Sequence, residues 1–169
     1  MALTGGAQGR SFKPTLFERL FDNAPRIAQE AVSLRRWSIE DLKESIATDL
    51  EALLNSRAGL RKVDYADYPE IGRSVLSFGM TDFVGLNLAS PADRNLICAT
   101  LEQTILVHEP RLKSVRIELD VDATSVNALR FNITALLHVH PASEPVNFDA
   151  TLRPSSLQYS VTRNGVRSA

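Results

Sequence analysis

The feature that most constrains the fold is a change of hydrophobic period after residue 112. From there to residue 163, apolar side chains recur at every second position, and charged or polar residues stand between them. Such alternation is typical of strands that bury one face. The pattern occurs in four stretches, separated by turn-forming residues at 122–127, 141–145 and 154–156; the stretches are residues 115–121, 129–139, 146–153 and 157–162. They predict an antiparallel β-meander with one polar face that packs on helices.

Two long helices are predicted before this meander. Ser38 is a suitable N-cap, with acidic residues in the first turn, and the first helix should end near 55–57. Ser90 caps the second helix, Pro91 takes its first position, and Pro110 bounds it. The fold class is therefore α+β, with N-terminal helices packed on a C-terminal antiparallel meander of about four strands.

The region between the two long helices is predicted to hold one short helix. Pro69 starts it, it spans 70–77, and Gly79 ends it. A turn-rich loop with a buried aromatic residue, Phe83, should follow.

The N-terminal part is predicted to be a flexible lead, residues 1–36, before a single α+β domain over 37–169. Within the lead, a short amphipathic segment over about 14–21 places four large apolar side chains on one helical face: Leu16, Phe17, Leu20 and Phe21. So short a helix must pack on something. Two interpretations are open: it docks on a partner protein, or it packs on its own domain.

Charge and cysteine content exclude several classes of protein. The 169 residues carry a formal net charge of -1, and no global basic excess favours nucleic acid or an anionic membrane. The single cysteine, Cys98, cannot form an internal disulfide. No apolar run is long enough for membrane insertion, and the Gly-rich start lacks a signal-peptide core, so a cytoplasmic location is expected.

Candidates for catalysis or metal binding are weak. His138 and His140 share one face of a predicted strand, and His108 is the third histidine, but solvent-exposed histidines explain them more simply than a metal site. Carboxylates are plentiful, yet nothing pairs two of them across a cleft as a glycosidase needs. Neither a phosphate-binding loop nor a nucleophile elbow is present. No catalytic residue, metal or cofactor is therefore predicted.

The motif that stands out is Glu109-Pro110-Arg111-Leu112, at the junction of the second helix and the first strand. A glutamate at a helix C-terminus opposes the helix dipole, which is a local cost. Pro110 fixes the backbone between a carboxylate and a guanidinium, the group best suited to bidentate recognition. Glu109 and Arg111 either contact a partner or form an internal ion pair that fixes the corner.

Several short motifs together resemble one family. They are Leu50–Arg57 (LEALLNSR), Tyr68-Pro69-Glu70, Ser74–Gly79 (SVLSFG), Asp82-Phe83 and the Glu-Pro-Arg run. In this order they resemble the baseplate wedge and sheath-initiator family of contractile-tailed phages, and most closely its TssE branch in bacterial type VI secretion. The resemblance covers about residues 14–163. One departure is Met80-Thr81-Asp82, where family members often have Leu-Pro-Asp.

This resemblance implies a fold similar to the inner domain of contractile sheath proteins. It also implies a non-enzymatic role: the subunit sits beside wedge subunits of the TssF and TssG type and offers strands that sheath subunits extend. By this resemblance, Glu109, Pro110 and Arg111 hold the subunit on the wedge core. The outermost strands, including residues 157–163, are candidates for strand addition.

Two other functions remain open from the sequence. Some members of the family carry a lysozyme-like label, which corresponds to a cell-wall hydrolase. A small regulatory binder of the anti-adaptor kind is the other alternative.

Overall fold

The computed structural model describes residues 37–60, 62–81, 90–120, 128–139, 142–153 and 155–163, together with the single residues 12, 15, 16, 20, 26 and 86. The chain divides into two compact units, residues 1–46 and 47–169. Each unit is described by itself.

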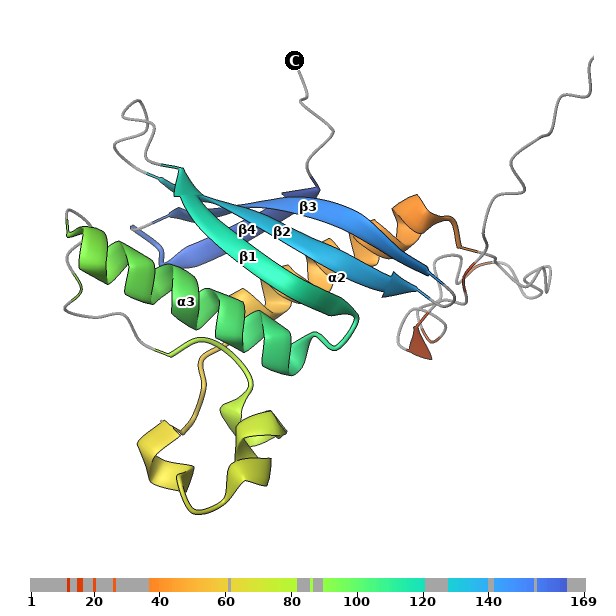
Figure 1. Cartoon of the computed structure of the whole chain (residues 1–169). Coiled ribbons are helices and arrows are strands. Elements are labelled where there is room, and N and C mark those ends of the chain that lie inside the picture. Colours follow the sequence, from red (N-terminus) through yellow and green to blue (C-terminus); the bar gives the residue numbers. More distant parts are fainter. Residues whose placement is uncertain are drawn as a thin grey trace, which may run out of the picture. The chain divides into compact units, whose positions relative to one another are not determined.

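The described elements follow the predicted order, helices first and sheet second (Figure 1). The two long helices are α2 (Ile39–Asn55) and α3 (Pro91–His108), and three short 3-10 helices lie between them: η1 (Lys62–Tyr65), η2 (Pro69–Arg73) and η3 (Val75–Ser77). The strands are β1 (Leu112–Asp120), β2 (Leu129–Val139), β3 (Ala142–Arg153) and β4 (Gln158–Arg163). The predicted α+β class, with two helices and a four-strand antiparallel meander, is confirmed.

The strands pair in chain order, β1-β2-β3-β4, and every pairing is antiparallel. One face of the sheet is apolar and buried; its side chains are those of Leu112, Val115, Ile117, Phe131, Ile133, Ala135, Leu137, Val146, Phe148, Ala150, Tyr159 and Val161. The helices pack on this face: α3 runs beside β1 in Figure 1 and buries Ile97, Leu101 and Ile105. The alternation that predicted the strands therefore also identified the buried face.

The predicted turn at 141–145 is wrong for residues 142–145, which belong to β3, where Pro145 lies opposite Leu136 of β2; Pro141 lies outside the described residues. A proline lacks the N–H that a central strand would use. The pairing of β3 with β4 reaches only from Phe148 to Arg153, so the first half of β3 is a sheet edge. The backbone nitrogen of Pro145 faces that open side of β3, so the missing N–H costs no hydrogen bond between strands.

The strand β1 begins at Leu112, earlier than predicted. Its register shifts between Lys113 and Arg116, and Ser114 has a positive φ of 52°. This bulge adds an extra residue, which breaks the strict alternation and explains why the pattern became readable only from Val115. Val121 and the predicted turn at 122–127 lie outside the described residues.

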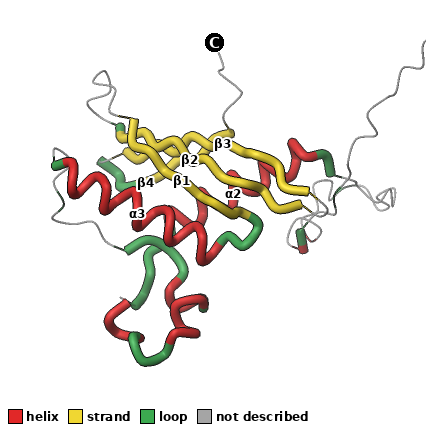
Figure 2. The backbone as a smooth tube through the Cα atoms, viewed as in Figure 1, coloured by secondary structure: helices red, strands yellow, loops and turns green. Residues whose placement is uncertain are grey.

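Residues 69–77, where one short helix was predicted, form two 3-10 helices, η2 and η3 (Figure 2). Ser74 separates η2 from η3 in an extended conformation, and its hydroxyl accepts a hydrogen bond from the Leu76 amide at 3.2 Å. Serine competes for backbone groups in this way, which explains the break. Phe83, in the predicted loop, lies outside the described residues.

Gly79 ends this region beside the last turn of α2. Its φ is +110°, and a Cβ atom there would lie 2.6 Å from the Ser56 carbonyl oxygen. The next residue, Met80, is buried and donates its amide hydrogen to the same Ser56 oxygen at 2.8 Å. Glycine at residue 79 is therefore required by both conformation and space.

The first unit includes the start of α2. The Ser38 hydroxyl accepts from the Asp41 amide at 3.1 Å, and the Asp41 carboxylate accepts from the Ser38 amide at 2.9 Å. This reciprocal capping confirms the predicted N-cap. Phe12 and Trp37 exchange two backbone hydrogen bonds of 2.8 Å. The predicted boundary at residue 36 stays a prediction.

Candidate functional site

The Glu109-Pro110-Arg111 motif forms a tight corner between α3 and β1. Glu109 caps α3, and its amide donates to the Ile105 carbonyl at 2.8 Å. Its own carbonyl accepts from the Leu112 amide at 3.1 Å, which closes a turn across Pro110 and Arg111. The strand begins at Leu112, so the motif is held at both ends by regular structure.

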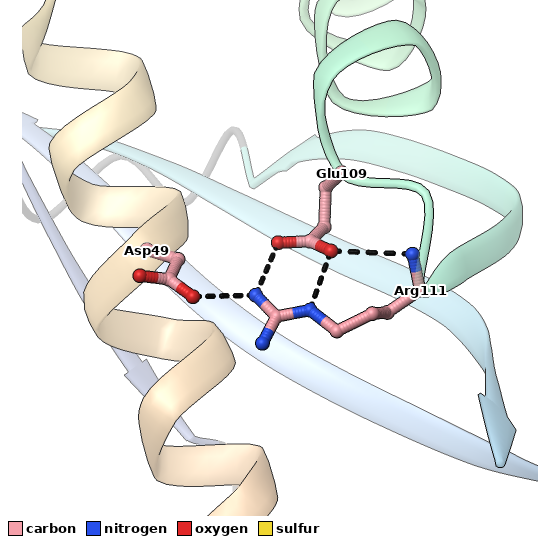
Figure 3. A network of polar contacts seen from close by, with 3 residues as sticks. All are labelled: Asp49, Glu109 and Arg111. Carbon is pink, nitrogen blue, oxygen red and sulfur yellow. Dashed lines mark hydrogen bonds and ion pairs between the residues drawn. The ribbon is translucent and has the colours of Figure 1, made fainter. Parts of the chain in front are cut away.

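The side chains of Glu109 and Arg111 pair with each other (Figure 3). Arg111 Nε donates to Glu109 Oε1 at 2.6 Å, and Arg111 Nη2 donates to Glu109 Oε2 at 2.5 Å. The Arg111 backbone amide also donates to Oε1, at 3.2 Å. The carboxylate thus receives three hydrogen bonds from one residue, and the bidentate part has the planar geometry that arginine favours.

A second carboxylate, that of Asp49 on α2, completes the network. Asp49 Oδ2 accepts from Arg111 Nη2 at 2.5 Å. Asp49 and Arg111 lie 62 positions apart in the chain, so this contact ties α2 to the corner. Nothing in the sequence pointed to Asp49, because it occupies an ordinary polar position on an amphipathic helix.

Of the three side chains in the network, that of Glu109 is the most buried and that of Asp49 the most exposed. The exposed fraction is 8% for the Glu109 side chain, 25% for Arg111 and 53% for Asp49. A buried carboxylate is stable only when it is paired, and Arg111 supplies that pair. The question left open by the sequence is therefore answered for the free chain: Glu109 and Arg111 form an internal ion pair.

Arg111 also has an outward side. Its Nη1 nitrogen makes no contact with either carboxylate in Figure 3, and the second oxygen of Asp49 is likewise unpaired there. No described residue hydrogen-bonds to Nη1. The corner thus leaves the Nη1 donors of Arg111 and one carboxylate oxygen of Asp49 outside the network. A partner can contact this outward side without breaking the buried pair.

Charge stabilises the guanidinium. Burial alone would lower the pKa of Arg111, but the hydrogen bonds and negative charges of Glu109 and Asp49 outweigh it and raise that pKa above its ordinary value. Arg111 is therefore positively charged at every pH at which the protein is folded.

The other predicted contact segment is only partly described. Leu16 and Leu20 are helical, and both side chains are largely exposed. Phe17 and Phe21 lie outside the described residues. Exposed leucines are what the partner-docking interpretation of this segment requires.

The two histidines that the structure describes, His108 and His138, have separate partners. His108 Nε2 donates to the Ser77 carbonyl at 3.0 Å, and its ring stacks edge-on with Phe78. Burial lowers the pKa of His108, and the hydrogen bond to Ser77 opposes that shift. His138 lies on the polar face of β2, near Ser143, and His140 is outside the described residues. Within the described ranges, no three potential metal ligands cluster.

A hollow of about 630 Å³ lies between the 58–81 region and α3. Its lining includes Tyr65, Arg73, Gln103 and His108. None of the described residues that line it is an aspartate or a glutamate. The described part of the lining therefore does not supply the two carboxylates that glycoside hydrolysis needs.

Comparison with known proteins places this architecture in a family. None of the described helices is long and apolar enough to cross a membrane. A search among curated proteins finds no match. A family model described as baseplate wedge protein gp25 matches residues 40–142, more than half of the chain, and this range includes α2 except its first residue, the Glu109–Arg111 corner and the first two strands. The chain therefore belongs to the baseplate wedge protein gp25 family, whose members are structural, non-enzymatic components of contractile injection machines.

Proposed function

We propose that this chain is the TssE-type subunit of a type VI secretion baseplate and works in the cytoplasm. In this role it docks on wedge subunits of the TssF and TssG type and initiates polymerisation of the contractile sheath by strand addition. It needs no cofactor. The observation that carries the proposal is the Glu109–Arg111 corner within a chain of the gp25 family.

The corner suits docking for two reasons. It is rigid, because Pro110 fixes its backbone and the buried ion pair fixes its side chains, so binding costs little conformational entropy. It also leaves Arg111 Nη1 and one Asp49 oxygen without a partner in Figure 3, on side chains that are 25% and 53% exposed. Planar arginine groups of this kind are common in protein interfaces.

The N-terminal segment is proposed as a second contact. Exposed Leu16 and Leu20, with Phe17 and Phe21 predicted on the same face, would fit an apolar groove of a partner. This contact is separate from the corner and can be tested separately.

Co-purification at native expression levels tests the proposal. We expect TssF-type and TssG-type subunits to be retained with the full chain. Recovery of a protease adaptor in their place would favour the regulatory alternative. Hydrolysis of purified peptidoglycan, abolished by substitution of a carboxylate, would favour the lysozyme-like alternative. Either result contradicts the proposal.

A further inference from the structure

The outer strands β1 and β4 are both covered by helix side chains, and they are covered differently. At the outer edge of β4, the Tyr159 amide donates to Asn55 Oδ1 at 2.8 Å, and the Tyr159 carbonyl accepts from Asn55 Nδ2 at 2.9 Å. Two residues on, the Val161 amide donates to Glu51 Oε2 at 2.8 Å. The Asn55 side-chain amide therefore takes the place of a peptide group in a neighbouring strand.

Asn55 and Glu51 lie one turn apart on α2, so a single helix face closes the central part of β4. Both the donor and the acceptor of Tyr159 are occupied. A strand that added to β4 would have to displace three hydrogen bonds of ordinary length before it formed its own. This edge is thus protected against further pairing.

At the outer edge of β1, the described helix side chains cover backbone amide groups but not the carbonyl groups. The Ile117 amide donates to Glu102 Oε1 at 2.8 Å. The Leu119 amide faces the thiol of Cys98, one turn earlier on α3; burial raises the pKa of that thiol overall, and the Leu119 amide acts to lower it. Sulfur is a weak acceptor. No described residue hydrogen-bonds to the outward carbonyls of Ile117 and Leu119.

Besides the Ile117 amide, Glu102 has one further contact among the described residues. Its second oxygen lies 3.9 Å from Nη1 of Arg116, whose side chain is 79% exposed, and this surface pair is weak. An incoming strand could thus replace one carboxylate and one thiol while using carbonyls that are already unoccupied.

We propose that strand addition occurs along residues 116–120 of β1, with displacement of Glu102, and that α2 keeps β4 closed. The inference rests on the proposed function and identifies the edge. The occupant is an extended segment of a sheath subunit with period-two hydrophobicity, because its inward side chains would continue the apolar face beyond Ile117. The bulge at Lys113–Arg116 ends the straight part of the edge and limits the register.

Site-specific photo-cross-linking in assembled baseplates tests the choice of edge. Glu118 on β1 and Ser160 on β4 are both exposed on the polar face, and each is replaced in turn by p-benzoylphenylalanine in the full chain. We expect cross-links to sheath subunits from position 118 and none from position 160. Cross-links from 160, alone or together with 118, would overturn the proposal.

The same samples separate this inference from the proposed function. Absence of cross-links at both positions, with TssF-type and TssG-type subunits still co-purifying, would refute strand addition and leave wedge docking intact. Loss of those wedge subunits from the unsubstituted chain would refute the proposed function itself.

A matched pair of variants tests the role of the helix side chains. Glu102→Ala and Glu51→Ala each remove one carboxylate that accepts from an edge amide. With folding checked by thermal unfolding, we expect Glu102→Ala to increase the yield from position 118 by several-fold. Glu51→Ala should leave position 160 unreactive, because Asn55 still occupies Tyr159. Equal yields before and after Glu102→Ala would contradict displacement of Glu102.

Discussion

At the scale of single residues, the Glu109–Arg111 pair has a structural role as well as a proposed docking role. Glu109 is buried and depends on Arg111 for its three hydrogen bonds. Arg111→Ala should therefore lower the free energy of unfolding by about 2–4 kcal/mol, since it leaves a buried carboxylate without its partner. Chemical denaturation of the isolated subunit measures this.

Asp49→Asn is the control for that loss. It removes a charge from the same network at a half-exposed position and leaves the buried pair intact. We expect it to cost no more than about 1 kcal/mol. Equal losses for the two variants would contradict the assignment of Glu109 as the buried member that needs Arg111.

Tyr159 provides a pH-dependent test. Its hydroxyl is buried without a hydrogen-bond partner among the described residues, and burial raises its pKa to about 12. The unfolded chain ionises near pH 10, whereas the folded chain keeps the phenol neutral. This residue's contribution to stability is therefore complete below pH 10 and is lost as the pH rises from 10 toward 12.

Tyr159→Phe should remove that pH dependence. At neutral pH the variant should be as stable as the wild-type chain or more stable by up to about 1 kcal/mol, because an unsatisfied hydroxyl is deleted. Denaturation curves at pH 7 and pH 11 provide the comparison. A clear loss of stability at pH 7 would mean that the hydroxyl has a partner after all.

At the scale of elements, the connection between the 58–81 region and α2 depends on Gly79. Gly79→Ala forces a Cβ atom against the Ser56 carbonyl at a positive φ, so we expect a loss of at least about 2 kcal/mol. Gly59→Ala is the matched control, since its Cβ would lie 3.7 Å from the nearest atom, the Leu76 carbonyl oxygen. Similar melting temperatures for the two variants would contradict this explanation.

The N-terminal segment is tested by the double substitution Leu16→Ser and Leu20→Ser. Both side chains are largely exposed, so the melting temperature should stay within about 2 °C. Recovery of wedge subunits should fall several-fold. Leu96→Ser, an exposed leucine on α3, is the control and should leave recovery unchanged. A large fall in stability would instead indicate that the segment packs on its own domain.

The elements themselves were predictable to different degrees. Capping residues and periodicity fixed α2 and α3, because local interactions decide where those helices start. The start of β1 was missed because the Ser114 bulge interrupts the alternation. Pro145 was misread as a turn residue, since the sequence does not reveal that β4 is too short to pair with the first half of β3.

At the scale of the whole molecule, the fold class and the motif at the corner could be read from the sequence, but the contacts between distant segments could not. Asp49 beside Arg111, Asn55 on β4 and Glu102 on β1 depend on how helices pack on the sheet. Each is a polar residue at a position where any surface residue would fit the helical pattern. Tertiary placement alone distinguishes them.

The covering of the outer edges of β1 and β4 fits the proposed role of the second unit. A subunit that accepts strands must not pair with copies of itself before assembly. Side chains from α2 and α3 meet that need by occupying the outward amides of β4 and β1. These side-chain contacts protect β4 more completely than β1, and this difference is the reason for proposing β1 as the edge that accepts a strand.

The central claim is that the outward side of Arg111 docks the subunit on the wedge. Arg111→Lys tests it most directly, because lysine keeps the positive charge beside Glu109 but removes the planar donors. Arg116→Lys makes the same chemical change at an exposed residue of β1 and serves as the control. The readout is the recovery of TssF-type and TssG-type subunits with each full-length variant, after thermal unfolding has confirmed that both are folded. We expect recovery to fall at least tenfold for Arg111→Lys and to stay unchanged for Arg116→Lys. Full recovery with a folded Arg111→Lys variant would contradict the claim and leave the corner with a purely structural role.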